Sequence, residues 1–429
     1  YWGRIYGSVM SPSLQVIKQA DEGGYEVFSA WAKMLQVLAI SKLTAIHGPV
    51  IYSNYGVSGQ ANIYDKEDVL YNKLFADLDA VQAVFAANKD YKGLTKFDAS
   101  YAGDIAKWSK LINSMRLRLA IRISKVAPAL AKTQGEKALS DPAGLISSNG
   151  DNFNVSLYGD KIPVNVICFE WGDTRMGSGM ESFGVGMKDN RITSFFAPAS
   201  DNTLYPDHPD WPYKGIHSGA FLDAKDQRLT YSTINESFKS VTSRRYFTYS
   251  EVCHLKAEAA LRGWAGAGDA KTNYEDGVRA SFADWGAGGV DAYLADDTSK
   301  PINYVDPKDS RNNWTSRSDV TVAWNDADSN ERKLEKIITQ KYFNNFTNAL
   351  ETWVDHRRTG YPKLPYNTKN DSNADWGVIP ADQFIKRMPF INGERNNNAD
   401  GVADATTKLG GPDLISTRLW WDTGNPNNF

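Results

Sequence analysis

Residues 246–286 read Tyr246-Phe-Thr-Tyr-Ser-Glu251-Val-Cys-His-Leu-Lys256-Ala-Glu258-Ala-Ala-Leu261-Arg-Gly263-Trp264, then Ala-Gly-Ala-Gly268, then Asp269-Ala-Lys-Thr-Asn-Tyr274-Glu-Asp-Gly277-Val-Arg-Ala-Ser-Phe-Ala-Asp-Trp285-Gly286. Apolar residues recur at helical spacing on both sides of the short Gly/Ala run. Glycine next to the last periodic residue is a typical helix stop. The stretch therefore predicts a helical hairpin, in which two amphipathic helices are joined by a turn.

A second stretch of the same kind runs from Glu335 to Leu364 and ends in Leu350-Glu351-Thr-Trp353-Val-Asp-His-Arg357-Arg358-Thr-Gly360-Tyr361-Pro362. The same periodicity marks helices elsewhere in the chain, and the segment 129–139 is the candidate partner of the helix before it. The predicted helices outside the first hairpin span residues 28–46, 65–85, 105–126, 331–342 and 348–358.

The helix predicted over 105–126 has two apolar stripes, one through Trp108 and Met115 and one through Leu117 and Ile121. Both of its sides must be covered, as in stacked helical repeats. The segments between the hairpins are rich in Gly, Asn, Asp, Pro and Ser, which favours loops. The chain is therefore expected to be mainly α, with TPR-like hairpins forming a scaffold and a few short strands in the insertions.

No segment has the composition of a linker, so residues 1–429 are expected to form a single unit. The scaffold is expected over about residues 25–140, 246–286 and 331–358. The loop-rich insertions are expected at 144–242, 287–329 and 361–429, and the last of these is predicted to be irregular.

Composition and motifs exclude several classes of protein. The net charge of -3 gives no electrostatic case for binding nucleic acid. No run of about 18 apolar residues is present to cross a membrane. The motifs Gly-x-Ser-x-Gly and His-Glu-x-x-His and the phosphate-binding Gly-rich loops are missing from the sequence. Cys168 and Cys253 lack metal-type spacing, and a disulfide between them is not favoured. The sequence predicts no enzyme and no cofactor.

Two chemical alternatives stay open at this point. A glycosidase needs two carboxylates in one cleft, about 5 to 10 Å apart, and 51 acidic residues could include such a pair. Residues 396–404 match several ligand positions of an EF-hand loop, but Thr407 stands where the bidentate glutamate belongs. No metal site is assigned there.

Buried charge is expected in the helices. Five arginines lie on helices that are predicted to be covered by neighbours, so salt bridges to acidic residues are more plausible than an anion-binding site. These are Arg116, Arg118, Arg122, Arg357 and Arg358. His254 and His356 lie on packing helices and are expected to be structural.

Several segments together resemble one family. They include Gly103-Asp104-Ile-Ala-Lys-Trp108 with Asn113-Ser-Met-Arg-Leu-Arg-Leu-Ala-Ile-Arg-Ile123, Asp189-Asn-Arg-Ile192, Tyr213-Lys-Gly215, Glu335-Lys-Ile-Ile-Thr-Gln-Lys341 and Thr417-Arg-Leu-Trp-Trp-Asp422. With the two hairpins they resemble the SusD/RagB family of outer-membrane nutrient-binding lipoproteins from Bacteroidetes. The resemblance extends from about residue 25 to the end. Departures such as Asn190 in place of Pro are conservative.

The resemblance implies a cell-surface lipoprotein that binds a nutrient, most simply a glycan, and delivers it without catalysis to a SusC-like TonB-dependent outer-membrane transporter. It also implies a signal peptide and a lipidated cysteine upstream of Tyr1, so that the N-terminal part of the protein would be missing from this sequence. Glycan, glycopeptide and peptide all stay open as ligands. The alternative functions are a glycan-active hydrolase and a TPR-type scaffold that binds no ligand.

The 13 tryptophans fall into two groups. Those in helix stripes or family motifs are expected to be structural: Trp31, Trp108, Trp264, Trp285, Trp353, Trp420 and Trp421. Those in loops are candidates for stacking on sugar rings: Trp2, Trp171, Trp211, Trp314, Trp324 and Trp376. Prolines flanking Trp211 stiffen its loop, and polar side chains surround Trp314 and Trp324. The predicted ligand-binding residues are Trp211, Tyr213, Trp314 and Trp324, and the alternative is that they fill local loop cores.

Overall fold

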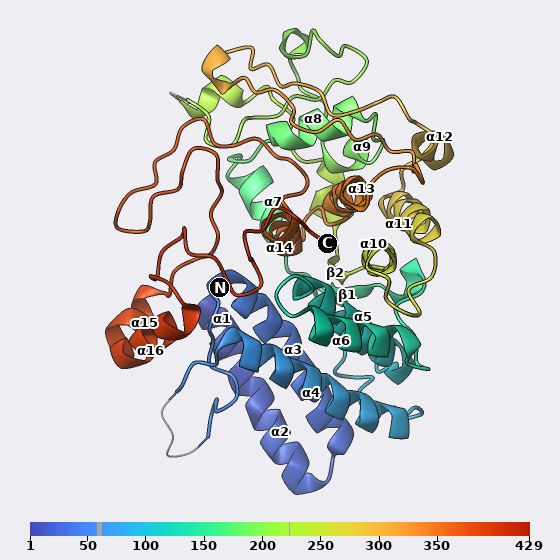
Figure 1. Cartoon of the computed structure of the whole chain (residues 1–429), viewed down its shortest axis with the longest axis vertical. Coiled ribbons are helices and arrows are strands. Elements are labelled where there is room, and N and C mark those ends of the chain that lie inside the picture. Colours follow the sequence, from blue (N-terminus) through green and yellow to red (C-terminus); the bar gives the residue numbers. More distant parts are fainter. Residues whose placement is uncertain (58–61, 223) are drawn as a thin grey trace.

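The computed structural model describes residues 1–57, 62–222 and 224–429 (Figure 1). Helices dominate this part of the chain, and its two strands pair antiparallel in one small sheet. The predicted mainly α fold is therefore confirmed. The strands are β1 (Phe153–Ser156) and β2 (Ser243–Phe247). The helices are α1 (Trp2–Ile5), α2 (Ser11–Gly23), α3 (Glu26–His47), α4 (Glu67–Ala87), α5 (Ile105–Arg122), α6 (Pro128–Ser140), α7 (Pro163–Asn165), α8 (Ser178–Gly186), α9 (Ile192–Phe195), α10 (Tyr249–Leu261), α11 (Ala270–Trp285), α12 (Val290–Leu294), α13 (Asn330–Asn344), α14 (Ala349–Thr359), α15 (Asn392–Asn397) and α16 (Ala399–Leu409).

The hairpins predicted from the sequence form, with small shifts at their ends. Successive helices pack side by side from α2 to α6, and α5 then packs against α10. Helix α10 in turn contacts both α11 and α13 (Figure 1). Almost every residue of α5 is buried, which agrees with its two apolar stripes.

Two glycines allow ring side chains to lie directly against helix backbones. A Cβ on Gly277 of α11 would lie 2.8 Å from Nε2 of His254 on α10. A Cβ on Gly135 of α6 would lie 2.2 Å from the ring of Trp264, which follows α10. His254 and Trp264 are both buried, so the structural roles predicted for them are confirmed.

Most of the core lies in two clusters of apolar side chains, and two smaller clusters lie within residues 162–238. The first lies among α1 to α6 and the end of the chain, around Trp108 and Trp421. The second lies among α8, α9, α11 and α13, around Phe195 and Phe343. Helix α14 occupies the middle of the molecule in Figure 1, and its Val354 belongs to the first cluster. The insertions thus pack against a helical frame.

Some local interpretations of the sequence are wrong. The tail after residue 361 is not irregular throughout, because α15 and α16 lie in it. Residues 396–404 fall almost entirely within these two helices, so the partial EF-hand match does not form a calcium-binding loop. Trp2, grouped above with the loop tryptophans, lies in α1 and is buried. The expectation that Cys168 and Cys253 form no disulfide is confirmed, because both are free and buried.

Within the described ranges, no helix is both long and apolar enough to span a membrane.

Buried ion pairs join α5 to the later hairpins. Arg118 of α5 donates through Nη2 to Glu251 of α10 at 2.7 Å. One turn further along α5, Nη2 of Arg122 donates to Glu351 of α14 at 2.8 Å. All four side chains are nearly inaccessible to solvent. Removing one partner from such a pair strands the other charge in the interior and costs about 3–5 kcal/mol.

Helix α14 is held in the same way further along the same face. Arg358 donates through both terminal nitrogens to Glu258 of α10, and Lys341 of α13 lies 2.7 Å from Asp355. The positive neighbours hold the pKa of Glu258 down to about 2 despite its burial. Salt bridges are thereby confirmed for Arg116, Arg118, Arg122 and Arg358.

The interpretation of Arg357 as a salt-bridge partner is wrong. Its guanidinium donates instead to the carbonyl oxygens of Ala45, at 2.6 Å, and Lys386, at 2.7 Å. It also stacks on the rings of Trp353 and Trp421, with its Cζ 3.6 Å and 4.7 Å from the two centroids. Burial lowers the pKa of Arg357 to about 9, so the group is still a cation at neutral pH.

The first prediction concerns the scaffold. Trp264→Ala is expected to lower the free energy of unfolding by about 3–5 kcal/mol, because a buried indole packed against the α6 backbone is lost. Chemical denaturation measures the effect. Trp171→Ala is the matched control, because Trp171 is 60% exposed and its loss is expected to change stability by less than about 0.5 kcal/mol. Equal stabilities for the two variants would contradict the packing described for α6 and α10.

The second prediction concerns pH. Burial lowers the pKa values of His47, His254 and His356 to about 4, about 3 and about 4. The unfolded chain therefore takes up protons at these sites from about pH 6.5 downward, where the folded protein does not, and stability falls as the pH drops from 6.5 to 4. The pKa of Glu67 is raised to about 7 by burial and acts in the opposite direction, as do the raised pKa values of Asp284 and His208. The lowered pKa of His217 adds to the effect of the three imidazoles.

Urea denaturation at pH 7 and at pH 4.5 measures the difference. The Glu67→Gln variant, which lacks one of the opposing groups, is expected to show a steeper loss of stability on acidification. Constant stability between the two pH values in the unsubstituted protein would mean that these imidazoles are not held neutral by burial.

Candidate ligand-binding site

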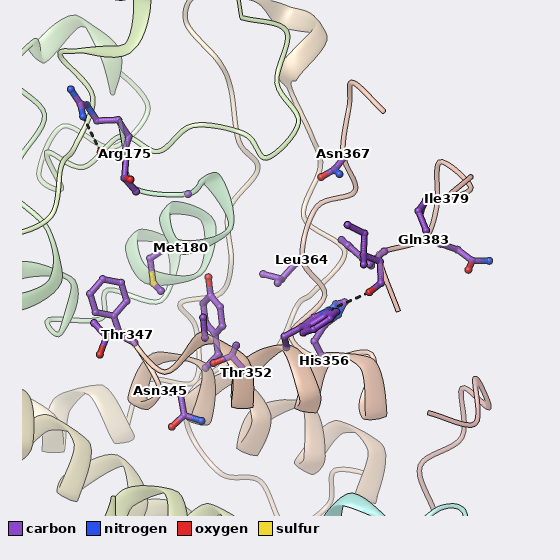
Figure 2. A pocket seen from close by; sticks show the side chains of 18 of the residues that line it. Arg175, Met180, Asn345, Thr347, Thr352, His356, Leu364, Asn367, Ile379 and Gln383 are labelled. Atoms are coloured by element: carbon purple, nitrogen blue, oxygen red, sulfur yellow. Dashed lines mark hydrogen bonds between the residues drawn. The ribbon is translucent and has the colours of Figure 1, made fainter. Parts of the chain in front are cut away.

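A cavity of about 700 Å³ lies between α8, α14, the loop before α8 and the C-terminal tail (Figure 2). We call it the first cavity. Its size falls in the range of about 300–1,000 Å³ that proteins use for small-molecule ligands. Most of its surface is apolar, and the largest apolar contributors include Met180, Phe196, Phe346, Trp353, Leu364 and Phe384.

The ring of Trp353 is held in place within this wall. It is half-buried in α14, and its Nε1 donates to the carbonyl oxygen of Ile385 at 3.2 Å. The guanidinium of Arg357, one helical turn later, covers one face of the ring at 3.6 Å. A ring fixed in this way loses little conformational entropy when a ligand packs on it. Trp353 is therefore suited to act as a stacking surface.

Polar groups are spread over the apolar surface of the first cavity. Asn345 just after α13 and Asn367 and Gln383 in the tail are among the lining residues, but the amides of Asn345 and Gln383 point away from the other labelled side chains in Figure 2. The hydroxyl of Thr352 adds a group on α14 itself. A few polar groups on an apolar lining are the usual arrangement in sites that orient a small ligand.

Charge contributes little to this lining. His356 lines the cavity, but burial lowers its pKa to about 4, so its ring is neutral at pH 7. Its ring also packs edge-on against Phe384, with 4.7 Å between centroids. The guanidinium of Arg175 donates to nearby carbonyl oxygens, those of Gly172 and Thr174. The arrangement suits an uncharged ligand that has apolar faces and polar edges.

The segment before α8 contains both exposed apolar side chains and residues that line this cavity. Trp171 is 60% exposed and Ile167 is 37% exposed, and both are neighbours in sequence of lining residues of the first cavity. Cys168, which lies between them, lines the cavity and is largely buried, and that burial raises the pKa of its thiol.

None of the four ligand-binding residues predicted from the sequence lines the first cavity. Trp211 is half-buried and packs, like Tyr213, against the second apolar cluster. Tyr213 itself is only 5% exposed, so little of its ring is open to a ligand.

Trp314 and Trp324 lie apart from each other in the second insertion. Nε1 of Trp314 donates to Oγ of Ser178 at 3.1 Å, which places this ring beside the start of α8. Trp324 packs on Tyr274 with 5.2 Å between centroids, and its Nε1 donates to Asp326. Both rings are half-buried. A ligand-binding role for Trp211, Tyr213, Trp314 and Trp324 stays a prediction.

The sequence analysis assigned Trp353 to the structural group because it lies on a helix stripe. The structure agrees in part, since Arg357 and the tail hold the ring, but it also places the ring in the cavity wall. No local pattern distinguishes these roles. The return of residues 364–385 to α14 completes the cavity.

Comparison with known proteins identifies the family. The sequence profile described as SusD-like, SusD and RagB outer-membrane lipoprotein, matches residues 1–422. No curated protein matches the chain. A chitin-binding SusD homologue from Flavobacterium johnsoniae is 36% identical, with a TM-score of 0.93 over 100% of this chain and 87% of that one.

Two further solved structures are similar. A SusD-like protein from Bacteroides thetaiotaomicron is 31% identical, with a TM-score of 0.88 over 98% of this chain and 86% of that one. A chitin-binding protein is 28% identical, with a TM-score of 0.78 over 98% of this chain and 87% of that one. The profile match over nearly the whole chain and these likenesses show that the protein belongs to the SusD-like family of outer-membrane lipoproteins.

Proposed function

We propose that this protein binds a glycan at the cell surface and delivers it to a SusC-like TonB-dependent transporter, without catalysis. One observation carries the proposal. The protein is 36% identical, over its whole chain, to a SusD homologue that binds chitin. A second similar structure is also of a chitin-binding protein. We therefore infer that the ligand class is a β-1,4-linked N-acetylglucosamine oligosaccharide.

The first cavity is the proposed place of binding. A pyranose ring has an apolar C–H face that packs on an aromatic ring, and Trp353 offers a ring held still from behind by Arg357. The N-acetyl group has one N–H donor and one carbonyl acceptor, which match the side-chain amide of Asn367. Its methyl group suits the apolar wall around Met180. Binding by these contacts needs no charge on the sugar, in agreement with the nearly uncharged lining.

The composition of the lining supports binding rather than hydrolysis. Glycosidases use two carboxyl groups in one cleft. Among the described residues that line the first cavity, Asp371 is the only carboxylate. The alternative of a glycan-active hydrolase therefore has no matched pair at this place. Delivery to a transporter is inferred from membership of the family.

The third prediction tests binding against catalysis. Isothermal titration calorimetry with N-acetylglucosamine oligosaccharides is expected to show saturable binding, because the cavity offers stacking and amide contacts together. Prolonged incubation of the same mixtures is expected to release no new reducing ends. New reducing ends would favour the hydrolase, and absence of binding to these oligosaccharides and to a wider glycan panel would favour a scaffold that binds no ligand.

The fourth prediction locates the site. Trp353→Ala is expected to weaken oligosaccharide binding by about 1–3 kcal/mol, because a stacking surface is lost. Trp353→Phe keeps an aromatic face and is expected to retain more of the affinity. Calorimetry measures both variants, with thermal melts alongside them.

Trp211→Ala, Trp314→Ala and Trp324→Ala form the comparison set, because they remove the tryptophans predicted from the sequence. If Trp353→Ala binds like the unsubstituted protein while one of these three loses binding and keeps its fold, the first cavity is not the site.

A further inference from the structure

A second cavity, of about 660 Å³, adjoins the first. Its walls come from α7, the 3-10 helix Glu236–Ser240, β2 and the end of α11. It shares two lining residues with the first cavity, Val164 and Thr347. The two cavities are therefore adjacent at Val164 and at Thr347, which lies in the connection between α13 and α14.

The second cavity is the more polar of the two. Several side-chain hydroxyls line it, among them those of Ser194, Ser237, Ser240, Thr242, Ser243 and Thr347. The amide of Asn235 and the guanidinium of Arg245 join them. Hydroxyls that both donate and accept can pair with the hydroxyl groups of a sugar in more than one orientation.

Arg245 is fixed before any ligand arrives. Its Cζ lies 3.8 Å from the ring centroid of Trp285, and its Nη2 donates to the backbone oxygen of Asp284 at 2.8 Å. The carboxylate of Asp284 lies 3.3 Å from Nε and balances the charge. Arg245 therefore presents an ordered donor whose charge is balanced, while Arg244, which also lines this cavity, lies over the ring of Tyr246 with its Cζ 5.0 Å from the centroid.

Thr347, at the junction of the two cavities, has an unusual backbone. Its φ is +74°, a conformation that β-branched residues rarely adopt. The neighbouring residues hold it there. Phe346 stacks on Phe195 with 4.3 Å between centroids, and the backbone N–H of Asn348 donates to Asn345 at 2.7 Å. A strained residue that the structure maintains in this way is a recurrent feature of binding sites.

We propose that the two cavities bind successive parts of one oligosaccharide chain, with Thr347 as the residue that positions the chain where it passes from the apolar cavity to the polar one. This inference rests on the proposed glycan-binding function. Its consequence is that the protein discriminates by chain length. A disaccharide fits within the first cavity, whereas a longer chain adds contacts to the hydroxyls of the second.

The test is a calorimetric length series with N-acetylglucosamine disaccharide, tetrasaccharide and hexasaccharide. The hexasaccharide is expected to bind at least about tenfold tighter than the disaccharide, the gain that one good additional contact provides. Ser237→Trp, at an exposed position of the second cavity, is expected to fill that cavity and bring this ratio close to one. Thr347→Gly is expected to reduce the ratio as well, because the positioning side chain is lost.

Lys188→Gly is the matched control for Thr347→Gly. Lys188 also has a positive φ, of +54°, but it is exposed and lines neither cavity. Both glycine variants relieve strain and are expected to melt at or above the temperature of the unsubstituted protein. Only Thr347→Gly is expected to lose length discrimination.

Equal affinity for all lengths in the unsubstituted protein would overturn the inference and leave the proposed function in place. A preserved ratio in either Ser237→Trp or Thr347→Gly would overturn it too. Absence of binding at every length would overturn both the inference and the choice of ligand class.

Discussion

Because buried charges must be paired, the positions of the helices at the centre of this protein are fixed relative to one another. Arginines of α5 meet glutamates of α10 and α14, and Arg358 of α14 returns to Glu258 of α10. None of these groups can reach water, so each helix must keep the position in which its charges are matched. Segments more than 200 residues apart in sequence, such as those of Arg122 and Glu351, are thereby held in one arrangement.

The geometry of the candidate site depends on this arrangement of helices. Helix α14, locked by Glu351 on the side of α5, carries Trp353 two residues later into the cavity wall. The same helix holds the opposite wall, since Trp353 and Arg357 donate to the carbonyl oxygens of Ile385 and Lys386 in the tail. Burying an ion pair is seldom the most stabilising choice for a core. Here the buried ion pairs hold α14 in a single position, and α14 supports two walls of one cavity.

The helical frame could be predicted because its signals are local. Apolar periodicity, a Gly/Ala turn and paired family motifs gave α10 and α11 to within a few residues, and the arginines of α5 were correctly read as buried partners of acids. Helix α16 was missed, because Ala399–Leu409 looks like a polar loop until packing in the first apolar cluster buries Ala405 and Leu409. Arg357 was misread because carbonyl partners leave no mark in a sequence.

The cavity could not be predicted, because it is made by distant segments that meet only in the folded chain. Trp353 lies on an ordinary helical stripe, and the tail residues that complete the site have no periodicity of their own. Loop composition pointed instead to Trp211, Tyr213, Trp314 and Trp324. Their roles remain predictions, with Tyr213 largely buried and Trp324 packed on Tyr274.

A crystal structure of the protein with a bound N-acetylglucosamine hexasaccharide tests most directly the claim that α14 carries the binding surface. The account predicts a sugar ring packed on Trp353, amide contacts to the tail, and a chain that continues past Thr347 into the second cavity. Sugar density against Trp211, Trp314 or Trp324, with none at Trp353, would contradict it.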